Sequence, residues 1–262
     1  MRTIGVLGGM GPAAGIDFYA RVVAAHAAKR DQDHPPCILF SATQVPDRTA
    51  FLFGDGPDPT LALVAAARTL QAAGADFIAI PCNSAHAFLA AIREAVDIPV
   101  LDMIALAAAA GGAEIARQIA TSESAAADAE SGRPAGLPKV GLLAASGTVR
   151  DGLYDGPLRR HGLEPVYPEA SVQEHEVMAA IRAVKAGAAA LGGASDPRLV
   201  AAAQHLLERG AGCLIMGCTE VPLALAAADC PIPALDANQL LAETTLALAL
   251  GTLDFADCEG AG

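Results

Sequence analysis

The segment IGVLGGMG, residues 4–11, sets the architecture of the chain, because a short apolar run ends directly in a series of glycines. Such a run predicts a buried strand of a parallel sheet, and the glycines permit a tight turn with close backbone contacts. The same pattern returns as VGLLAASG at residues 140–147. The chain therefore contains a weak internal repeat, with one strand-and-turn unit at the start of each half.

Apolar runs that favour strands alternate with helical patterns throughout the sequence, which is typical of parallel α/β sheets. The expected strands lie at residues 3–7, 37–41, 77–80, 139–144, 164–166 and 213–216, and the expected helices at 13–29, 59–73, 85–95, about 174–190 and 197–209. We therefore predict an α/β fold with two similar domains, each a parallel sheet flanked by helices, within the 262 residues.

The expected domain boundaries follow the repeat. Residues 1–105 together with 224–262 form the first α/β domain, in which the C-terminal segment completes the N-terminal half, and residues 106–223 form the second. Residues 121–138, TSESAAADAESGRPAGLP, are small and polar and contain proline and glycine. This composition predicts a flexible, solvated loop within the second domain.

The composition limits the classes of partner. The formal net charge is −12 and the pI is about 4.8, which opposes long-range attraction to nucleic acid or anionic membranes. The N-terminus lacks the long apolar segment of a signal peptide, and no uncharged apolar run of about 20 residues predicts a membrane span. We therefore expect a cytoplasmic protein that binds a small molecule, with no nucleic-acid or membrane partner.

Six cysteines in a chain without a signal peptide are expected to be reduced thiols. No pair has C-x-x-C spacing and no histidine stands at metal-ligand spacing from a cysteine, so no metal site is expected. Cys82 ends the apolar run of DFIAIPCNS (76–84), and Cys218 ends that of GCLIMGCTE (212–220). Both are expected at the carboxyl ends of strands, where ligands bind in open α/β sheets.

The equivalent positions of Cys82 and Cys218 in the repeat indicate function. A helix that follows each thiol is expected to stabilise the thiolate and to lower the pKa of the cysteine. The remaining cysteines lack this context and are expected to pack as small hydrophobic side chains. They are Cys37, Cys213, Cys230 and Cys258.

Two thiols that face each other across a cleft suit the inversion of a carbon centre, in which one group removes a proton and the other delivers one. No pyridoxal phosphate motif is evident, so preorganised donors in a water-poor cleft must stabilise the carbanion. Asn83, Ser84 and Thr219 lie next to the cysteines and are candidates to hold an α-carboxylate. The pattern predicts a racemase that needs no cofactor.

Six segments in order carry a family resemblance: LGGMGP (7–12), VPDRTAF (45–51), PCNSAH (81–86), GLLAASGT (141–148), EVMAAIRAVKAG (176–187) and MGCTEVPL (216–223). Through them the chain resembles the aspartate/glutamate racemase family, and its aspartate racemase branch in particular, over nearly its whole length. The resemblance implies a pseudo-twofold relation of the two domains with the active site between them, no cofactor and a homodimer. The implied substrate is an acidic amino acid, with aspartate expected before glutamate.

The resemblance also implies roles for particular residues, with Cys82 and Cys218 as the catalytic thiols. The residues that it assigns to substrate binding are Met10, Gln44, Arg48, Asn83, Ser84, Thr148, Lys185 and Thr219. Within this set, Arg48 and Lys185 are the pair expected to bind the distal carboxylate. Asp47 and Glu220 are expected either to orient a thiol or to form ion pairs. Ala145 replaces a threonine of the relatives, so one substrate hydrogen bond is either missing or supplied by Ser146 or Thr148.

Alternative functions stay open at the level of sequence. The segment GMGPAA also fits the dinucleotide fingerprint G-x-G-x-x-A, but no acidic residue ends the second expected strand. A maleate-type isomerase or a malonate-type decarboxylase of the same superfamily would use a carboxylate-binding arginine equally well. A non-catalytic dicarboxylate-binding protein would be expected to lose one of the two thiols. His86 and His175 are expected on helix surfaces, with the tuning of a neighbouring group as the alternative role of each.

Overall fold

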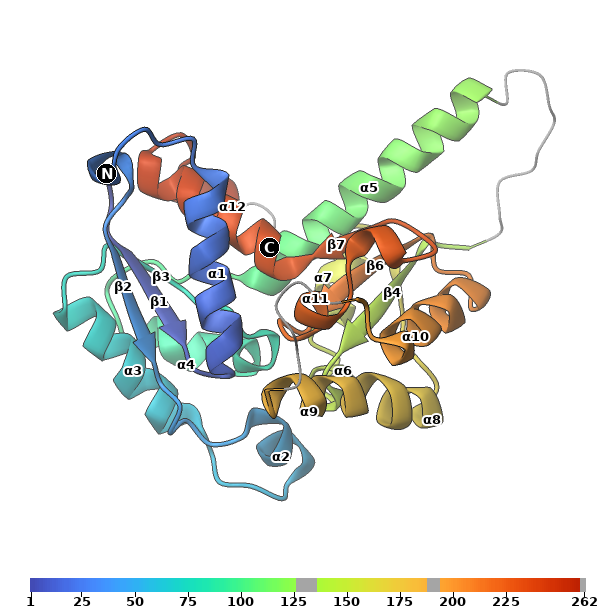
Figure 1. The fold of residues 1–262 in the computed structure, drawn as a ribbon, viewed down its shortest axis with the longest axis horizontal. Helices are drawn as coiled ribbons and strands as arrows, with labels where there is room; N and C mark the ends of the chain where they lie inside the picture. Colours follow the sequence, from blue (N-terminus) through green and yellow to red (C-terminus); the bar gives the residue numbers. More distant parts are fainter. Residues whose placement is uncertain (126–135, 188–193, 260–262) are drawn as a thin grey trace.

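The computed structural model describes residues 1–125, 136–187 and 194–259. Its strands form two parallel sheets, one in each half of the chain (Figure 1). The first sheet has the order β2-β1-β3 and consists of β1 (Ile4–Gly8), β2 (Cys37–Ser41) and β3 (Phe77–Ala79). Ile78 also forms a parallel bridge to Val100, which extends this sheet beyond β3.

The second sheet has the order β5-β4-β6-β7. Its strands are β4 (Lys139–Ala144), β5 (Glu164–Val166), β6 (Cys213–Gly217) and β7 (Ala234–Asp236). In each sheet the first strand of the repeat, β1 or β4, lies between two neighbours, and every residue of β1 is buried. The arrangement confirms the predicted α/β fold of two similar parallel sheets flanked by helices.

Helices cover the sheets, and two of them are exchanged between the halves. Helix α5 (Met103–Ala125) follows the first sheet but packs on α7 (Asp155–Arg160) and on β6 of the second. Helix α12 (Ala237–Leu250) follows β7 of the second sheet but packs on α1 (Pro12–Ala25), as Figure 1 shows. One continuous apolar core therefore joins both halves, and it contains Phe18, Phe77, Leu142 and Leu241.

The remaining helices are shorter or lie on the outer faces of the sheets. They are η1 (Asp31–Asp33), α2 (Arg48–Phe53), α3 (Thr60–Ala72), η2 (Asn83–Phe88), α4 (Leu89–Glu94), α6 (Ser146–Arg150), α8 (Ala170–Val172), a π-helical turn (Gln173–Met178), α9 (Ala179–Lys185), α10 (Pro197–Glu208), α11 (Val221–Ala224), η4 (Ala227–Asp229) and α13 (Phe255–Glu259).

The C-terminal segment, residues 224–262, contacts both halves of the chain. The C-terminal helix α12 lies against α1, as the assignment of residues 224–262 to the first domain requires. Strand β7 belongs to the same segment, yet it pairs with β6 of the second sheet. The division into 1–105 plus 224–262 and 106–223 therefore stays a prediction.

The expected loop at residues 121–138 is wrong at its N-terminal end. Helix α5 continues to Ala125, because its backbone continues the helical hydrogen bonding, and Thr121 Oγ1 donates to the carbonyl oxygen of Arg117 at 2.8 Å. The long helix extends away from the two sheets in Figure 1. Residues 126–135 lie outside the described residues, as do residues 188–190 of the helix expected over 174–190.

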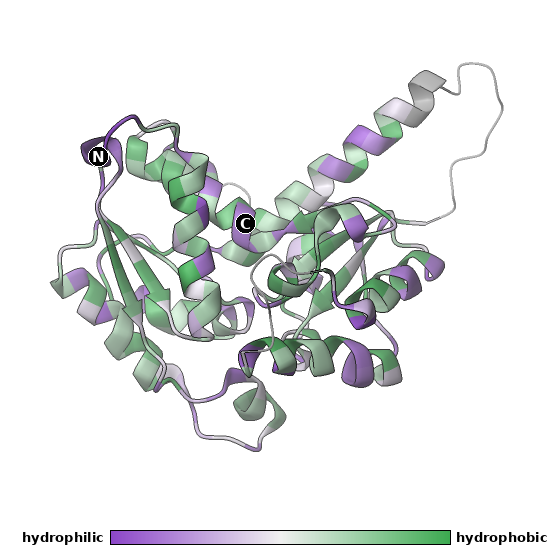
Figure 2. Cartoon of the chain, in the orientation of Figure 1, coloured by the Kyte–Doolittle hydropathy of each residue, from purple (hydrophilic) through white to green (hydrophobic). Residues whose placement is uncertain are grey.

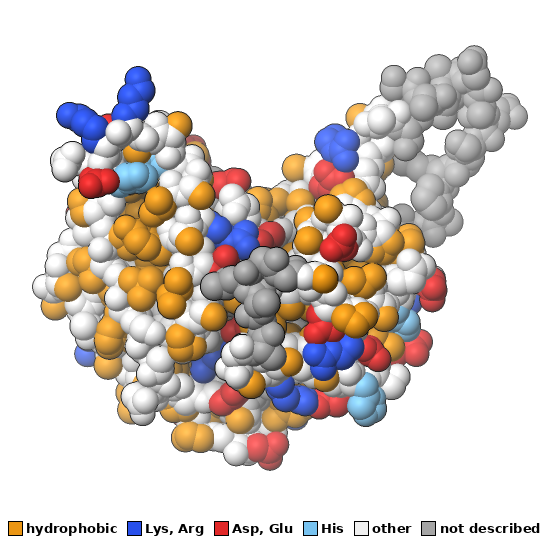
Figure 3. All heavy atoms as spheres, in the orientation of Figure 1, with side chains coloured by type: hydrophobic (Ala, Val, Ile, Leu, Met, Phe, Trp, Pro, Cys, Tyr) orange, Lys and Arg blue, Asp and Glu red, His pale blue; other side chains and the backbone are white. Residues whose placement is uncertain are grey.

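The distribution of hydropathy matches this layered arrangement. Figure 2 shows the strands as hydrophobic, whereas the covering helices carry hydrophobic and hydrophilic residues in alternation. Helices with one apolar stripe bury that stripe against a sheet. In the described part of the face drawn in Figure 3, basic and acidic side chains are interspersed. Among the helices that the structure describes, none has the length and apolar character to cross a membrane.

Candidate active site

The glycine-rich turn after β1 brings the backbone of Met10 between the two sheets. Gly9 has a φ of 95°, and a Cβ atom there would lie 2.5 Å from the backbone nitrogen of Ala42, so only glycine fits. The carbonyl oxygen of Met10 then accepts three donors: Arg48 Nη2 at 3.1 Å, Lys185 Nζ at 3.4 Å and Cys82 Sγ at 3.5 Å. The sequence pointed to Met10 as a lining residue, but the role of its carbonyl group depends on the fold.

Cys82 and Cys218 come from different sheets and line the same small cavity. Cys82 follows β3 and is 4% exposed, whereas Cys218 follows β6 and is 7% exposed. Thr219 Oγ1 donates to the carbonyl oxygen of Pro81 at 3.3 Å, which joins the two strand ends directly. The inner cavity has a volume of about 30 Å³ and is lined by Met10, Asp47, Arg48, Thr49, Cys82, Asn83, Ser84, Ala145, Thr148, Lys185, Gly217, Cys218, Thr219 and Glu220.

Glu220 links the Cys218 thiol to a cation. The carboxylate is 3% exposed, and its Oε2 accepts from Cys218 Sγ at 3.0 Å and from Thr219 Oγ1 at 3.5 Å. Its Oε1 accepts from Lys185 Nζ at 2.7 Å and from the backbone nitrogen of Gly11 at 3.1 Å. Cys218, Lys185 and the backbone of Gly11 thus hold the buried carboxylate, and Thr219 shares its single hydroxyl proton between Glu220 and the carbonyl oxygen of Pro81.

The pKa of Cys218 lies well above its ordinary value, because burial disfavours the thiolate and the Glu220 carboxylate repels it; Lys185 opposes the shift only in part. The expectation that a following helix lowers the pKa of this thiol is therefore wrong for Cys218. Helix α11 begins only at Val221 and has four residues, while Glu220 lies in direct contact with the sulfur. Local desolvation and a neighbouring anion outweigh the helix dipole.

The raised pKa leads to a prediction about reactivity. We expect iodoacetamide to alkylate Cys218 slowly near neutral pH and faster as the pH rises, since the thiolate is the nucleophile. In Glu220→Gln the anionic neighbour is removed, so the pKa of Cys218 falls and the alkylation profile moves to lower pH. Mass spectrometry of the Cys218 peptide between about pH 6 and pH 10 measures the profile. Glu243→Gln, at an exposed site on α12, is the control, and an unshifted profile in Glu220→Gln would contradict the prediction.

The two cations in the cavity wall have different partners. Lys185 is paired with Glu220; burial lowers the pKa of its ammonium group, but the attraction of Glu220 and Cys218 outweighs burial and raises it. Arg48 is 8% exposed and donates from Nη1 to the carbonyl oxygen of Pro46 at 3.0 Å and from Nη2 to that of Met10. Within the described residues Arg48 has no carboxylate partner, and its Nε has no partner at all. Arg48 is therefore the cation that is available to an anionic ligand.

Neutral donors face the same cavity. Asn83 is 2% exposed, and its Oδ1 accepts a hydrogen bond of 2.5 Å from the hydroxyl of Tyr154, a fully buried residue of the second half. In the described structure, Asn83 Nδ2 and Thr148 Oγ1 are buried without a hydrogen-bond partner. Buried polar atoms without partners are rare and costly, so both groups are available to hydrogen-bond a polar ligand in the cavity.

The turn that contains Ala145 also places a hydroxyl in the wall of the inner cavity. Ala145 lies in the wall of the inner cavity, as does Thr148, which is 1% exposed. Ser146 Oγ accepts from Gln173 Nε2 at 3.2 Å instead. Of the two hydroxyls that could substitute for the missing threonine, that of Thr148 therefore lines the cavity.

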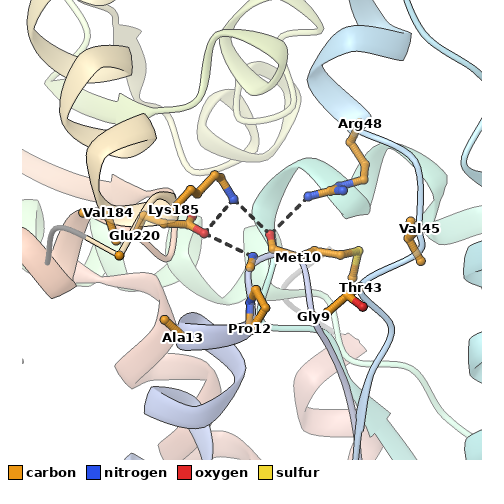
Figure 4. Close-up of a pocket in the computed structure, with 12 residues that line it drawn as sticks. Gly9, Met10, Pro12, Ala13, Thr43, Val45, Arg48, Val184, Lys185 and Glu220 are labelled. Carbon is orange, nitrogen blue, oxygen red and sulfur yellow. Dashed lines mark hydrogen bonds and ion pairs between the residues drawn. The ribbon is translucent and has the colours of Figure 1, made fainter.

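A larger outer cavity adjoins the inner one (Figure 4). Its volume is about 360 Å³, and it shares Met10, Arg48, Lys185 and Glu220 with the inner cavity. Figure 4 shows the Lys185–Glu220 pair and the Met10 carbonyl group at the wall of this space, with Arg48 approaching from the opposite side. The residues that line only the outer cavity are Gly9, Gly11, Pro12, Ala13, Thr43, Val45, Val184 and Gly187.

The structure brings together nearly all residues that the sequence assigned to the site. The linings of the two cavities include every one of them except Gln44, which is exposed on the loop between β2 and α2. Asp47 lines the inner cavity, but its carboxylate mainly caps α2 by accepting from the backbone nitrogen of Ala50 at 2.9 Å.

The expectation for His86 as a surface histidine is wrong, whereas His175 is exposed as expected. His86 is buried because η2 turns it toward the N-terminus of α5. Its Nδ1 donates to the carbonyl oxygen of Cys82 at 2.9 Å, and its Nε2 accepts from the backbone nitrogen of Met103 at 3.0 Å. Burial lowers the pKa of the ring, and a neutral ring makes both hydrogen bonds. His86 thus anchors the backbone of Cys82, a role that no sequence motif indicated.

Among the described residues, no three His, Cys, Asp or Glu side chains lie close enough together to hold a metal ion. The site consists instead of two thiols, one buried carboxylate, two cations and several neutral donors. Such a set can exchange protons with a ligand and bind its carboxylate groups.

Comparisons with known proteins agree with this arrangement. Among curated proteins, the broad specificity amino-acid racemase RacX of Bacillus subtilis is 24% identical over 263 residues, which cover 94% of this chain and 98% of RacX. Among solved structures, an aspartate racemase from Picrophilus torridus matches with a TM-score of 0.76 and 25% identity over 95% of this chain and 94% of its own. An aspartate racemase homologue from Pyrococcus horikoshii matches with a TM-score of 0.67 and 23% identity, over 95% of this chain and 100% of its own.

The family assignment rests on the sequence of both halves. The sequence model of the Asp/Glu/hydantoin racemase family matches residues 7–120 and, a second time, residues 118–245. Each half of the chain therefore matches the family separately. This result agrees with the internal repeat and confirms the resemblance inferred from the six segments. The chain belongs to the Asp/Glu/hydantoin racemase family and is, as a member of it, a racemase.

Proposed function

We propose that this protein interconverts the enantiomers of an acidic amino acid, with aspartate as the principal substrate and glutamate as a second one, without a cofactor. The observation that carries the proposal is the convergence of two buried thiols, from equivalent strands of the two sheets, on one cavity that also holds Arg48, an arginine without a carboxylate partner among the described residues. The names of the relatives support it, since they include an aspartate racemase and a broad specificity amino-acid racemase.

The reaction needs a base on one side of the α-carbon and an acid on the other. One cysteine, as its thiolate, takes the α-proton, and the electron pair of the broken C–H bond remains on the substrate. The other cysteine, as its thiol, donates a proton to the opposite face, and the new C–H bond completes the inversion. The two cysteines end with exchanged protonation states, so the reverse reaction starts from the product.

Glu220 is proposed as the group that readies Cys218 for proton abstraction. Its Oε2 is the acceptor for the Cys218 proton at 3.0 Å. A thiol with a raised pKa is a strong base once it is deprotonated, which suits the removal of a weakly acidic α-proton. Lys185 donates to Glu220 Oε1, and its positive charge offsets the negative charge that Glu220 and the Cys218 thiolate would otherwise carry together.

The α-carboxylate of the substrate is proposed to bind to the neutral donors, and the distal carboxylate to Arg48. Asn83 Nδ2 and Thr148 Oγ1 are buried and unpartnered in the described structure, so a carboxylate would satisfy them. Charge that spreads from the α-carbon onto the α-carboxylate in the transition state strengthens the same hydrogen bonds. The other proposed contacts, Ser84 and Thr219, flank these donors in the cavity wall.

The direct test is incubation of the purified protein with L-aspartate, and separately with L-glutamate, in deuterated buffer without added cofactor. NMR follows loss of the α-proton, and chiral chromatography follows the D-enantiomer. We expect exchange at the α-carbon together with inversion. Conversion of maleate or decarboxylation of a malonate, in the absence of exchange with either amino acid, would assign the site to the other members of the superfamily. The proposed enzyme is a cytoplasmic homodimer, which sedimentation and fractionation can test.

The hydrogen bond from Tyr154 to Asn83 gives a further prediction. Because it occupies Asn83 Oδ1, it directs the NH₂ group of the amide into the cavity. In Tyr154→Phe the amide is no longer oriented, and we expect kcat/KM for aspartate to fall about tenfold, through a higher KM and a lower kcat, the effect of one lost hydrogen bond. Tyr167→Phe is the control, since the Tyr167 hydroxyl donates to Asp155 outside the cavity at 2.5 Å.

A double-mutant cycle separates this positioning role from general damage. If Tyr154 acts through Asn83, then Tyr154→Phe has no further effect on kcat/KM in an Asn83→Ala background. An equal effect in both backgrounds would contradict the positioning role of Tyr154. Thermal unfolding of each variant measures the separate loss of stability from the buried hydrogen bond.

A further inference from the structure

We propose that His86 is a positioning residue, which links Cys82 to helix α5 and thereby keeps the two thiols at the spacing that inversion needs. The inference rests on the proposed racemisation and adds to it a residue outside the linings of both cavities. It is carried by the two hydrogen bonds of a buried imidazole ring and by the packing of α5 on the strand that leads to Cys218.

The two hydrogen bonds determine which form of the His86 ring fits. Nε2 lies 3.0 Å from the backbone nitrogen of Met103, and a backbone N–H can only donate, so Nε2 carries no proton. The proton of the neutral ring is therefore on Nδ1, which donates to the carbonyl oxygen of Cys82 at 2.9 Å. A proton on Nε2 would place two donors against each other. Only the neutral ring with its proton on Nδ1 bridges the two backbone groups.

At one end of this bridge, the ring holds the backbone that carries the Cys82 thiol. The carbonyl oxygen of Cys82 also accepts from the backbone nitrogen of Ala85 at 3.2 Å, within the turn of η2. The sulfur itself has longer contacts, at 3.5 Å to the carbonyl oxygen of Met10 and at 3.6 Å to Ser84 Oγ. Thiols form weak hydrogen bonds, so the backbone of Cys82 does more to fix the sulfur than its own contacts do.

At the other end, the ring completes the cap of α5. The first N–H groups of a helix have no acceptor within the helix. Asp102 Oδ1 accepts from the backbone nitrogens of Ile104 and Ala105, at 2.9 and 3.0 Å, and His86 accepts from that of Met103. Loss of the ring would leave a buried backbone donor without this acceptor, which is costly, so the start of α5 would shift away from Cys82.

Helix α5 extends the connection to the second sheet, because it packs on β6. The contact is close, since a Cβ atom at Gly111 would lie 3.5 Å from Ile215 Cδ1. Ile215 belongs to β6, the strand that ends directly before Cys218. The positions of Cys82 and Cys218 are thus coupled through the His86 ring, α5 and β6.

Displacement of Cys82 has a kinetic signature that loss of stability does not have. In the proposed mechanism, Cys218 removes the α-proton of one enantiomer, and deuterium from the solvent then replaces that proton on the sulfur. Return of deuterium by Cys218 to the same face gives exchange without inversion, whereas inversion needs a proton from Cys82 on the opposite face. A misplaced Cys82 therefore lowers inversion more than exchange, and for one enantiomer only.

Two conservative variants of His86 each keep one of the two bonds. The amide of His86→Asn lies near the position of Nδ1 and can donate to Cys82, and that of His86→Gln reaches the position of Nε2 and can accept from Met103. The experiment incubates each enantiomer of aspartate with each variant in deuterated buffer and follows α-proton loss by NMR and inversion by chiral chromatography. We expect inversion to fall about tenfold in both variants, while exchange of one enantiomer falls by about twofold or less.

The matched control is His175→Asn. His175 is exposed, and its Nδ1 makes the same type of contact with the carbonyl oxygen four residues earlier, that of Ser171, at 3.0 Å. We expect this variant to keep the inversion and exchange rates of the wild type.

Wild-type inversion in either variant of His86 would overturn the inference, because the bond that the variant lacks would then be dispensable. Equal losses of inversion and exchange for both enantiomers would also overturn it, and would assign His86 to stability alone. Absence of exchange in the wild type would overturn the proposed function, and this inference with it.

The wild-type protein provides a test that holds even if neither variant folds. NMR with nitrogen-15 labelling detects the scalar coupling across an N–H···N hydrogen bond, which identifies the His86 ring through the backbone nitrogen of Met103. We expect this coupling at Nε2 and a proton on Nδ1 near neutral pH. A His86 ring with its proton on Nε2 would overturn the bridge.

Discussion

Replacement of either Cys82 or Cys218 by serine is expected to lower the rate of aspartate racemisation by about three orders of magnitude or more. A serine hydroxyl is a far weaker acid than a thiol, so it supplies almost no alkoxide as a base at neutral pH. The two cysteines line one cavity from different sheets. Inversion requires both, because one removes the α-proton from one face of the α-carbon and the other supplies a proton to the opposite face. Chiral chromatography of the reaction products measures the loss.

A matched control is Cys230→Ser. Cys230 is half-buried near the surface of the second half, and its Sγ lies 3.8 Å from the carbonyl oxygen of Ala226, outside both cavities. We expect this variant to keep the activity of the wild type. Normal inversion by either Cys82→Ser or Cys218→Ser would refute the two-base mechanism, whereas loss of activity in Cys230→Ser would show that general damage causes the effect.

Replacement of Arg48 by alanine is expected to lower kcat/KM for aspartate about a hundredfold. Hydrogen bonds to charged groups contribute about 1.5–3 kcal/mol, and each 1.4 kcal/mol corresponds to about tenfold in binding. Arg48 is the cation without a carboxylate partner in the described part of the wall, so removing it leaves the distal carboxylate of the substrate unpaired. The effect should appear mainly in KM.

Asparagine distinguishes lost recognition from lost structure, because it has the shape of aspartate without the distal charge. We expect the ratio of kcat/KM for aspartate to that for asparagine to fall in Arg48→Ala. Arg150→Ala is the control variant: the Arg150 guanidinium lies 4.4 Å from the centre of the Phe53 ring in the same region, and does not line either cavity. Equal losses for both substrates would argue that Arg48 only holds the loop in place.

The positions of the two cysteines were predictable because parallel strands have a simple geometry. An apolar run followed by a polar residue marks the carboxyl end of a strand, and in both sheets these ends lie at the same edge. Asn83, Ser84 and Thr219 follow directly in sequence, so they arrive at the cavity with the cysteines. Gln44, which the resemblance assigned to the site, follows no such strand end and is exposed on the loop between β2 and α2.

The extent of helix α5 and the burial of His86 were not predictable from local pattern. Residues 121–125 are small and polar, yet they continue a helix whose start is fixed by Asp102 Oδ1 accepting from the backbone nitrogens of Ile104 and Ala105. His86 has the spacing of a surface residue on a helix, but the N-terminus of α5 packs against it, and the backbone nitrogen of Met103 donates to its Nε2. In both cases the deciding contact comes from another element.

The sequence by itself determined the fold class, the repeat, the positions of both thiols and the family, because periodicity and strand ends are local properties of the chain. Only the tertiary structure brings together the charged groups that surround Cys218 and shift the pKa of its thiol. Lys185 and Glu220 are 35 residues apart, and Gly11 and Glu220 are 209 apart, yet all three meet beside Cys218. The pKa of a buried thiol depends on desolvation and on charges within a few ångströms, which the folded chain alone brings together.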